Sequence, residues 1–135
     1  MSTSKNSSEI VAAIRANADK VISIAREQLG QELNFDEQAV RWLDGFIQRQ
    51  YKDADPAIRN GLINMLGSFL GECIIRNFGG EWVCVDGSWG IRFDDKSAVF
   101  PFAKVGKMLE NGSDDSVLGL YTLIPILFPS VSNRN

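Results

Sequence analysis

The first part of the chain has the apolar spacing of an amphipathic helix. Its apolar residues recur at alternating steps of three and four, which places them on one helical face. These residues are Val11, Ile14, Ala18, Val21, Ala25 and Leu29. We expect Ser7 or Ser8 to cap this helix, Gly30 to end it, and residues 1–8 to form a loose polar tail. Because the stripe is narrow, the helix could pack on its own domain or on a second copy as a homodimer.

A second helix is predicted from about Asp36 to Tyr51. Asn34 and Glu37 resemble a capping box at its start. Its apolar positions leave a polar face for solvent, made of Arg41, Asp44, Gln48 and Arg49. Trp42 falls at the edge of the apolar face, and a partly exposed tryptophan is a reasonable contact residue for a partner protein.

The third predicted helix runs from about Pro56 to Asn77, with Asp55 as its N-cap. Apolar residues cover most of its circumference, which is typical of a central, buried helix. Three interior glycines, Gly61, Gly67 and Gly71, each cost roughly 1 kcal/mol relative to alanine. We therefore expect another backbone to approach the helix closely at these positions.

After Gly79-Gly80 the apolar period changes from 3.6 to 2, which predicts strands over 81–85 and 89–93. Asp86-Gly87 favours a type I′ turn, which sets Val85 opposite Ser88 and Glu81 opposite Arg92. The same register puts four apolar residues on one face, which we expect to lie on the third helix. They are Trp82, Cys84, Trp89 and Ile91.

A third strand is expected over 97–100, a helix over 102–110, and a last helix capped by Ser113 or Asp114. The predicted fold is α+β, with three N-terminal helices, a three-stranded antiparallel β-meander and two C-terminal helices. A single domain would span residues 9–129, followed by a polar tail over 130–135.

Composition and charge narrow the classes of function. The 135 residues are 44% apolar and 23% charged with a net charge of −3, which indicates a globular domain without affinity for nucleic acid or an anionic membrane surface. Cys73 and Cys84 lie in apolar runs and are expected to be reduced and buried. The start of the chain does not resemble a signal peptide, so we expect a cytoplasmic protein.

The sequence contains no histidine, which excludes Ser-His and Cys-His nucleophiles and the HExxH zinc motif. Glu72 and Glu81 remain as an acid–base pair, although Arg76 and Arg92 are spaced to neutralise them. Turn and capping roles account for the clustered aspartates, and the glycines form no phosphate-binding motif. No metal and no cofactor are therefore expected.

The segment LGSFLGECIIRNFGGEWVCVDGSWGIRF, followed by AVFPFAKVGKMLENGSDDSVLGLY, resembles an uncharacterised family of small bacterial proteins. The resemblance covers roughly residues 60–122 and includes Leu70-Gly71-Glu72, Gly80-Glu81-Trp82 and Phe100-Pro101-Phe102. It implies an α+β fold and carries no activity, cofactor or catalytic residue.

Two hypotheses of function follow from these patterns. The first is a non-enzymatic, cytoplasmic protein-interaction module, immunity- or adaptor-like, with Trp42 as a contact. The second is a small-molecule binder or histidine-free enzyme that uses Glu72 and Glu81, with Trp82, Trp89 and Arg92 as further ligand contacts. The two tryptophans are also typical core residues at strand spacing.

Overall fold

The computed structural model describes residues 3–51, 53, 55–129 and 131. The helices are α1 (Thr3–Leu29), α2 (Glu37–Gln50), α3 (Pro56–Phe78), α4 (Pro101–Asn111) and α5 (Val117–Leu127), with a short 3₁₀ helix η1 (Gly112–Asp115) before α5. The strands β1 (Glu81–Val85), β2 (Ser88–Asp94) and β3 (Ser97–Val99) form one antiparallel sheet in the order β1-β2-β3. The predicted α+β fold is confirmed.

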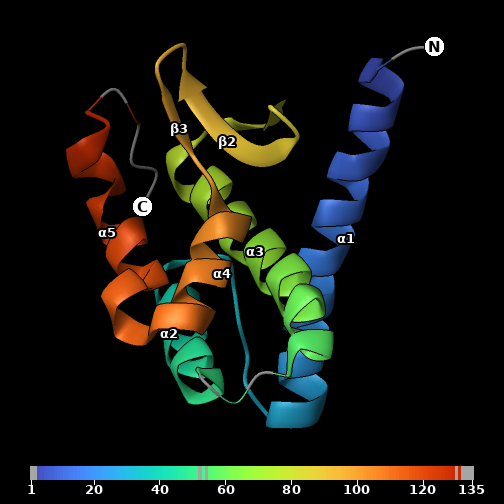
Figure 1. The fold of residues 1–135 in the computed structure, drawn as a ribbon, viewed down its shortest axis with the longest axis vertical. Helices are drawn as coiled ribbons and strands as arrows, with labels where there is room; N and C mark the ends of the chain where they lie inside the picture. The colour runs from blue at the N-terminus through green and yellow to red at the C-terminus, as the bar shows by residue number, and fades with distance from the viewer. Residues whose placement is uncertain (1–2, 52, 54, 130, 132–135) are drawn as a thin grey trace.

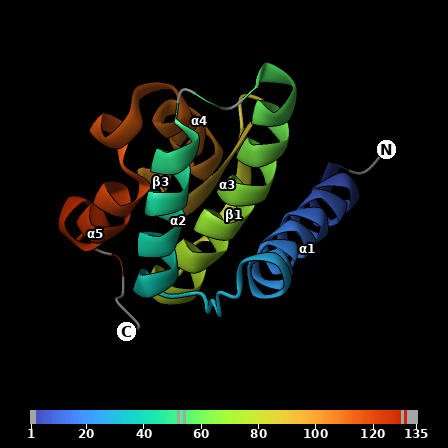
Figure 2. The same cartoon turned by 90° about the horizontal axis from the view of Figure 1, so that it is seen from below.

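Helix α3 lies at the centre, with α1 on one side and α4 and the sheet on the other (Figures 1 and 2). Its second half is continuously buried from Leu66 to Ile74. The apolar stripe of α1 is buried against the core at Ile14, Ala18, Val21 and Ala25. Because α1 packs chiefly on α3, the narrow stripe docks within its own domain.

The starts of the first two helices differ from the sequence prediction. Helix α1 begins at Thr3 rather than after a cap at Ser7 or Ser8, since residues 3–8 contain neither glycine nor proline to stop it. Asp36, not Asn34, caps α2, with its Oδ1 accepting from the Ala39 N–H at 2.9 Å. The expected cap of α3 at Asp55 is confirmed. Of the expected C-terminal tail, only residue 131 is among the described residues.

The β1–β2 hairpin has the predicted register. Glu81 pairs with Arg92 and Val85 with Ser88, as the turn chemistry requires. The central turn residues are in the left-handed region, with φ of 51° at Asp86 and 82° at Gly87. A β-bulge between Arg92 and Asp94 interrupts the pairing of β2 with β3.

Two of the three helix glycines are sites of close approach: the ring and the backbone Cα of Phe102 approach Gly67, as expected, whereas only the ring of Trp82 approaches Gly71. A Cβ at Gly71 would lie 2.1 Å from Cη2 of Trp82, and one at Gly67 would lie 2.4 Å from Cδ1 of Phe102. The two rings are neighbours, with centroids 5.6 Å apart. A Cβ at Gly61 would meet nothing within 4 Å, so the expectation of a close approach there was wrong.

The apolar face of the hairpin is covered only in part. Trp82 and Ile91 are buried, as expected, whereas Trp89 is half-buried and Cys84 is exposed. The expectation of a buried Cys84 was therefore wrong. Cys84 and Trp89 lie next to the turn, and this end of the hairpin reaches beyond the packed surface of α3 and towards α1.

The space that Gly71 leaves for the Trp82 ring, which we call a glycine notch, can be tested within one helix. Gly71→Ala should lower the free energy of unfolding by about 1–3 kcal/mol, because the new methyl group would push the Trp82 ring from its place. Gly61→Ala is the matched control and should raise it by roughly 1 kcal/mol, the gain in helix propensity alone. Urea unfolding of both variants measures this difference. Equal effects of the two substitutions would contradict the packing described here.

Candidate functional site

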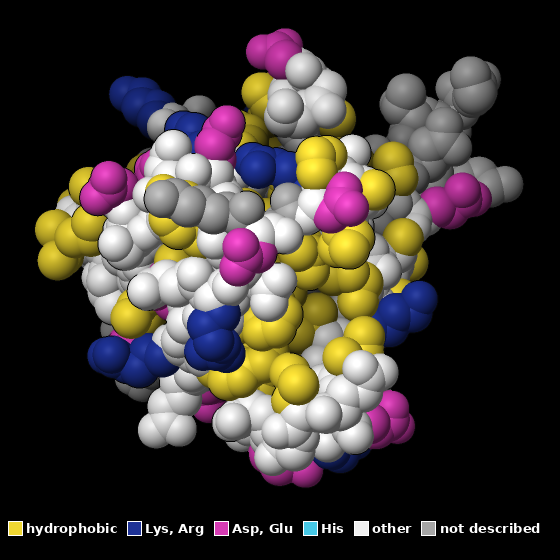
Figure 3. All heavy atoms as spheres, turned by 60° about the horizontal axis from the view of Figure 1, so that its bottom comes forward, with side chains coloured by type: hydrophobic (Ala, Val, Ile, Leu, Met, Phe, Trp, Pro, Cys, Tyr) yellow, Lys and Arg dark blue, Asp and Glu magenta, His cyan; other side chains and the backbone are white. Residues whose placement is uncertain are grey.

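A groove of about 880 Å³ opens between the N-terminal half of α1, the middle of α3, the turn end of the β1–β2 hairpin and the start of α4. We call it the hairpin groove. Its apolar lining includes Ile14, Ile63, Trp89, Phe100 and Phe102. Figure 3 shows apolar side chains gathered in a hollowed band across the face that it draws. Helix α1 thus leaves apolar surface accessible beside α3.

Small residues let the aromatic floor of the groove pack down. A Cβ at Gly90 would lie 2.7 Å from the Phe100 ring, and Gly67 admits Phe102 in the same way. On the opposite wall, Ile10 of α1 stays 41% exposed because its helix extends past the part of α3 that it covers. The groove is therefore built by long-range packing of four separate elements.

Few polar residues line the groove, and most of them are exposed. They are Asn17, Asn64, Ser68, Asp86 and Ser88. The Ser68 hydroxyl donates to the Asn64 carbonyl at 2.6 Å within its own helix, so it is already satisfied. Asp86 is the one charged side chain among the described residues that line the groove. The lining suits an apolar occupant that is neutral or positively charged at the hairpin end.

Glu72 is buried beside this site and is fully engaged. Its Oε2 accepts from the Trp82 Nε1–H at 2.9 Å, and its Oε1 lies 3.4 Å from Arg76 Nη2. Arg15 of α1 approaches the same carboxylate, with Nε 3.9 Å from Oε2. The predicted Glu72–Arg76 pair is confirmed, and Glu72 is a hydrogen-bond anchor for Trp82.

Glu81 and Arg92 do not join that cluster. Both are exposed and face each other across the strands, yet within the described part of the chain no ion pair links them. Successive side chains of a strand point to opposite faces, so Glu81 points away from the face on which Trp82 reaches Glu72. The two glutamates therefore do not converge, and the geometry of an acid–base pair is not formed.

The three tryptophans have separate environments. Trp89 is the one that lines the hairpin groove, whereas Trp82, on β1, is buried against α3. Trp42 is half-buried on α2 and stacks on Phe46 with ring centroids 5.4 Å apart, outside the groove. Of the predicted ligand residues, Glu72 and Trp82 are joined by a side-chain hydrogen bond, and only Trp89 lines the groove.

The two cysteines lie in different environments. Burial is the main cause that raises the pKa of the Cys73 thiol far above its ordinary value, so this group stays protonated. Cys84 is a free, exposed thiol on β1. Within the described residues, no group of three or more His, Cys, Asp or Glu side chains could hold a metal ion.

Comparisons with known proteins give no assignment: no family model, no curated protein and no solved structure matches the chain. The resemblance to a bacterial family over residues 60–122 therefore stays a prediction. In the described part of the chain, no helix is both long and apolar enough to cross a membrane.

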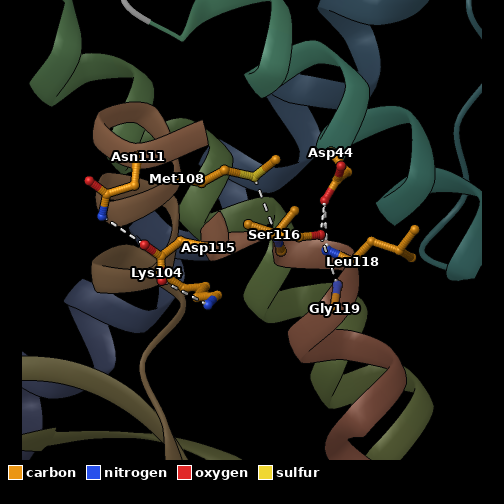
Figure 4. A network of polar contacts seen from close by, with 9 residues as sticks. Asp44, Lys104, Met108, Asn111, Asp115, Ser116, Leu118 and Gly119 are labelled. Atoms are coloured by element: carbon orange, nitrogen blue, oxygen red, sulfur yellow. Dashed lines mark hydrogen bonds and ion pairs between the residues drawn. The ribbon is translucent and has the colours of Figure 1, made fainter. Parts of the chain in front are cut away.

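A second polar cluster joins α2 to the start of α5 (Figure 4). Asp44 is buried, and its Oδ2 accepts from the Ser116 hydroxyl and from the Leu118 N–H, the latter at 3.0 Å. Its Oδ1 accepts from Gln48 Nε2 at 2.6 Å. Ser116 is the N-cap of α5, because its Oγ accepts from the Gly119 N–H at 3.0 Å. A carboxylate thus neutralises the positive end of the α5 dipole.

This Asp–Ser contact is structural. The Ser116 oxygen accepts a helix N–H, and Asp44 is held by three donors, so neither is free to act as nucleophile or base. The sequence prediction that Asp44 faces solvent was wrong, because the helical period places it correctly on α2 but does not show that α5 packs there. The predicted cap of α5 at Ser113 or Asp114 was also wrong. Residues 112–115 form the 3₁₀ helix η1, so α5 starts later and its cap is Ser116.

Asp115, at the end of η1, has its own partners. Its carboxylate accepts from Asn111 Nδ2 at 2.7 Å and lies 3.5 Å from Lys104 Nζ. The hydrogen bond from Asn111, with the charge of Lys104 as a further cause, lowers the pKa of Asp115 below its ordinary value. These contacts hold η1 against α4.

The Asp44 contacts predict a loss of stability without any change in the groove. Asp44→Ala should lower the free energy of unfolding by about 1.5–3 kcal/mol, because it leaves the Leu118 N–H unpaired and removes a charged acceptor from the α5 cap. Glu37→Ala, also on α2, removes an exposed pair with Arg41 and one negative charge from the first turn of α2, and should cost about 1 kcal/mol or less. Thermal and urea unfolding compare the two. A cost for Asp44→Ala no larger than that of Glu37→Ala would contradict a capping role.

Proposed function

We propose that this protein is a non-enzymatic interaction module whose hairpin groove binds an apolar segment of a partner protein. The observation that carries the proposal is the groove itself, about 880 Å³ and lined mainly by aliphatic and aromatic side chains. Exposed apolar surface of this kind, rimmed by polar groups, is typical of interaction sites. Trp89 is the natural anchor, since half-buried tryptophans are frequent hot spots in protein interfaces.

The positions and contacts of the candidate acids and of the Cys73 thiol support a binding role over a catalytic one. Glu72 holds Trp82, Glu81 points away from it, and the Cys73 thiol is protonated and buried. The charge of Asp86 at the hairpin turn favours a partner segment with a lysine, arginine or N–H donor at that end. An immunity- or adaptor-like role in the cytoplasm is consistent with such a module and stays a prediction.

A small apolar molecule is the second candidate for the groove. The volume of about 880 Å³ falls in the range of roughly 300–1,000 Å³ that is usual for ligand pockets. This candidate keeps Trp89 as a contact and does not need Glu72, Glu81 or Arg92. The experiment below distinguishes it from a protein partner by the mass of what is captured.

The test is site-specific photo-crosslinking from one face of α1. Ala13 is exposed and lines the groove, whereas Ala16, three residues further along α1, is exposed and does not. A diazirine amino acid at position 13 should give, in the native cell, an adduct of one defined protein mass. The same group at position 16 should give none.

Trp89→Ala, added to the position-13 protein, should abolish the adduct because it removes the aromatic wall of the groove. Trp42→Ala is the matched control and should leave the adduct unchanged, since Trp42 lies outside the groove. Capture of a molecule below about one kilodalton would replace the protein partner by the second candidate. Equal adducts from positions 13 and 16, no adduct at all, or loss of the adduct with Trp42→Ala alone would contradict the proposal.

A further inference from the structure

Helix α5 is apolar on two sides but buried on only one. Val117, Tyr121 and Ile124 form the side that packs into the core. On the other side Leu123, Ile126 and Leu127 are 44%, 70% and 55% exposed. A helix that is apolar all round is normally covered all round, so the outer side of α5 lacks a partner that its composition implies.

Four exposed residues of α5 and the half-buried Gly119 form a continuous stripe. Gly119, Thr122, Leu123, Ile126 and Leu127 are spaced i, i+3, i+4, i+7 and i+8, which is the spacing of one helical face. We call them the α5 stripe. Figures 1 and 2 both place α5 at the outer edge of the molecule, on the side away from α1, so the stripe and the hairpin groove are separate surfaces.

Charge is absent from this whole segment of the sequence. Residues 116–129 contain no Asp, Glu, Lys or Arg, although a chain that is 23% charged would place about three in fourteen positions. In a two-fold symmetric interface, residues near the axis face their own copies, so any charge there would face a like charge. An uncharged apolar stripe is complementary to itself.

The same absence of charge argues against a membrane surface or a different protein as the partner of the α5 stripe. Helices that lie on a membrane surface carry Lys and Arg along their polar face, and this segment has none in a chain of net charge −3. A different protein partner would normally be selected by complementary charges around the apolar contact, and the helix offers none. We propose that the α5 stripe is a self-association surface, which pairs with the α5 stripe of a second copy around a two-fold axis.

The expected dimer is weak. An eleven-residue helix is only about 16 Å long. Two such stripes bury much less than the roughly 1,600 Å² of a standard stable interface, so association should depend on protein concentration. This surface is independent of the groove, and its failure would leave the proposed function untouched.

Sedimentation equilibrium over a concentration series tests the proposal on the full chain. The mean mass should rise from 14.9 kDa towards twice that value as concentration increases. Ile126→Glu should keep the protein monomeric at every concentration, because it places two like charges at the interface. Ile58→Glu is the matched control: Ile58 is 58% exposed but lies on α3, so this variant should behave like the wild type.

A mixing arm tests the symmetry. Ile126→Lys alone should also be monomeric, whereas an equimolar mixture of Ile126→Glu and Ile126→Lys should recover the concentration-dependent dimer. Circular dichroism confirms that each variant is folded. A wild type that stays at 14.9 kDa throughout, or an Ile126→Glu variant that still dimerises, would overturn the proposal.

A lipid surface and a different protein, the two other possible partners of the α5 stripe, would each give a different result. Co-sedimentation of a monomeric wild type with phosphatidylcholine vesicles, lost in Ile126→Glu, would assign the stripe to a lipid surface and overturn self-association. A monomeric wild type that binds another protein through Ile126 would overturn it as well.

Discussion

The packing of the Trp82 indole on α3 is the contact on which the rest of the structure depends. The ring occupies the space above Gly71 that any side chain there would fill, and its N–H donates to the buried carboxylate of Glu72. The missing side chain at Gly71 makes room for the ring, and the hydrogen bond to Glu72 fixes its orientation. The β1–β2 hairpin is thereby held at one place and in one orientation on α3.

The hairpin groove follows from this anchor. With Trp82 fixed, the turn end of the hairpin reaches towards α1 and carries Trp89 to the edge of the groove. Phe102 packs beside Trp82 and enters the second notch, at Gly67, so the start of α4 is aligned on the same helix. Glu72 therefore contributes to the groove indirectly, by holding one of its walls, and the sequence had suggested the same residue as a direct ligand.

Local patterns predicted most of the fold, because helix caps, turn chemistry and apolar periods act over a few residues. The register of the hairpin, the pair Glu72–Arg76 and the central place of α3 all came from such patterns. Long-range packing was beyond them. The pattern of α2 predicts that Asp44 faces solvent, but α5 packs against it. The alternation in β1 predicts that Cys84 is buried, but the turn end of the hairpin extends past α3 and leaves it exposed. The groove could not be predicted, since its walls come from four elements distant in the sequence.

The central claim is tested most directly by a double-mutant cycle between Glu72 and Trp82. Trp82→Phe keeps an aromatic ring and removes the N–H donor, and Glu72→Ala removes the acceptor. Urea unfolding of the wild type, both single variants and the double variant gives their coupling free energy. A hydrogen bond to a buried carboxylate predicts a coupling of about 1.5–3 kcal/mol. Additive effects, with a coupling near zero, would contradict the view that this bond positions the hairpin.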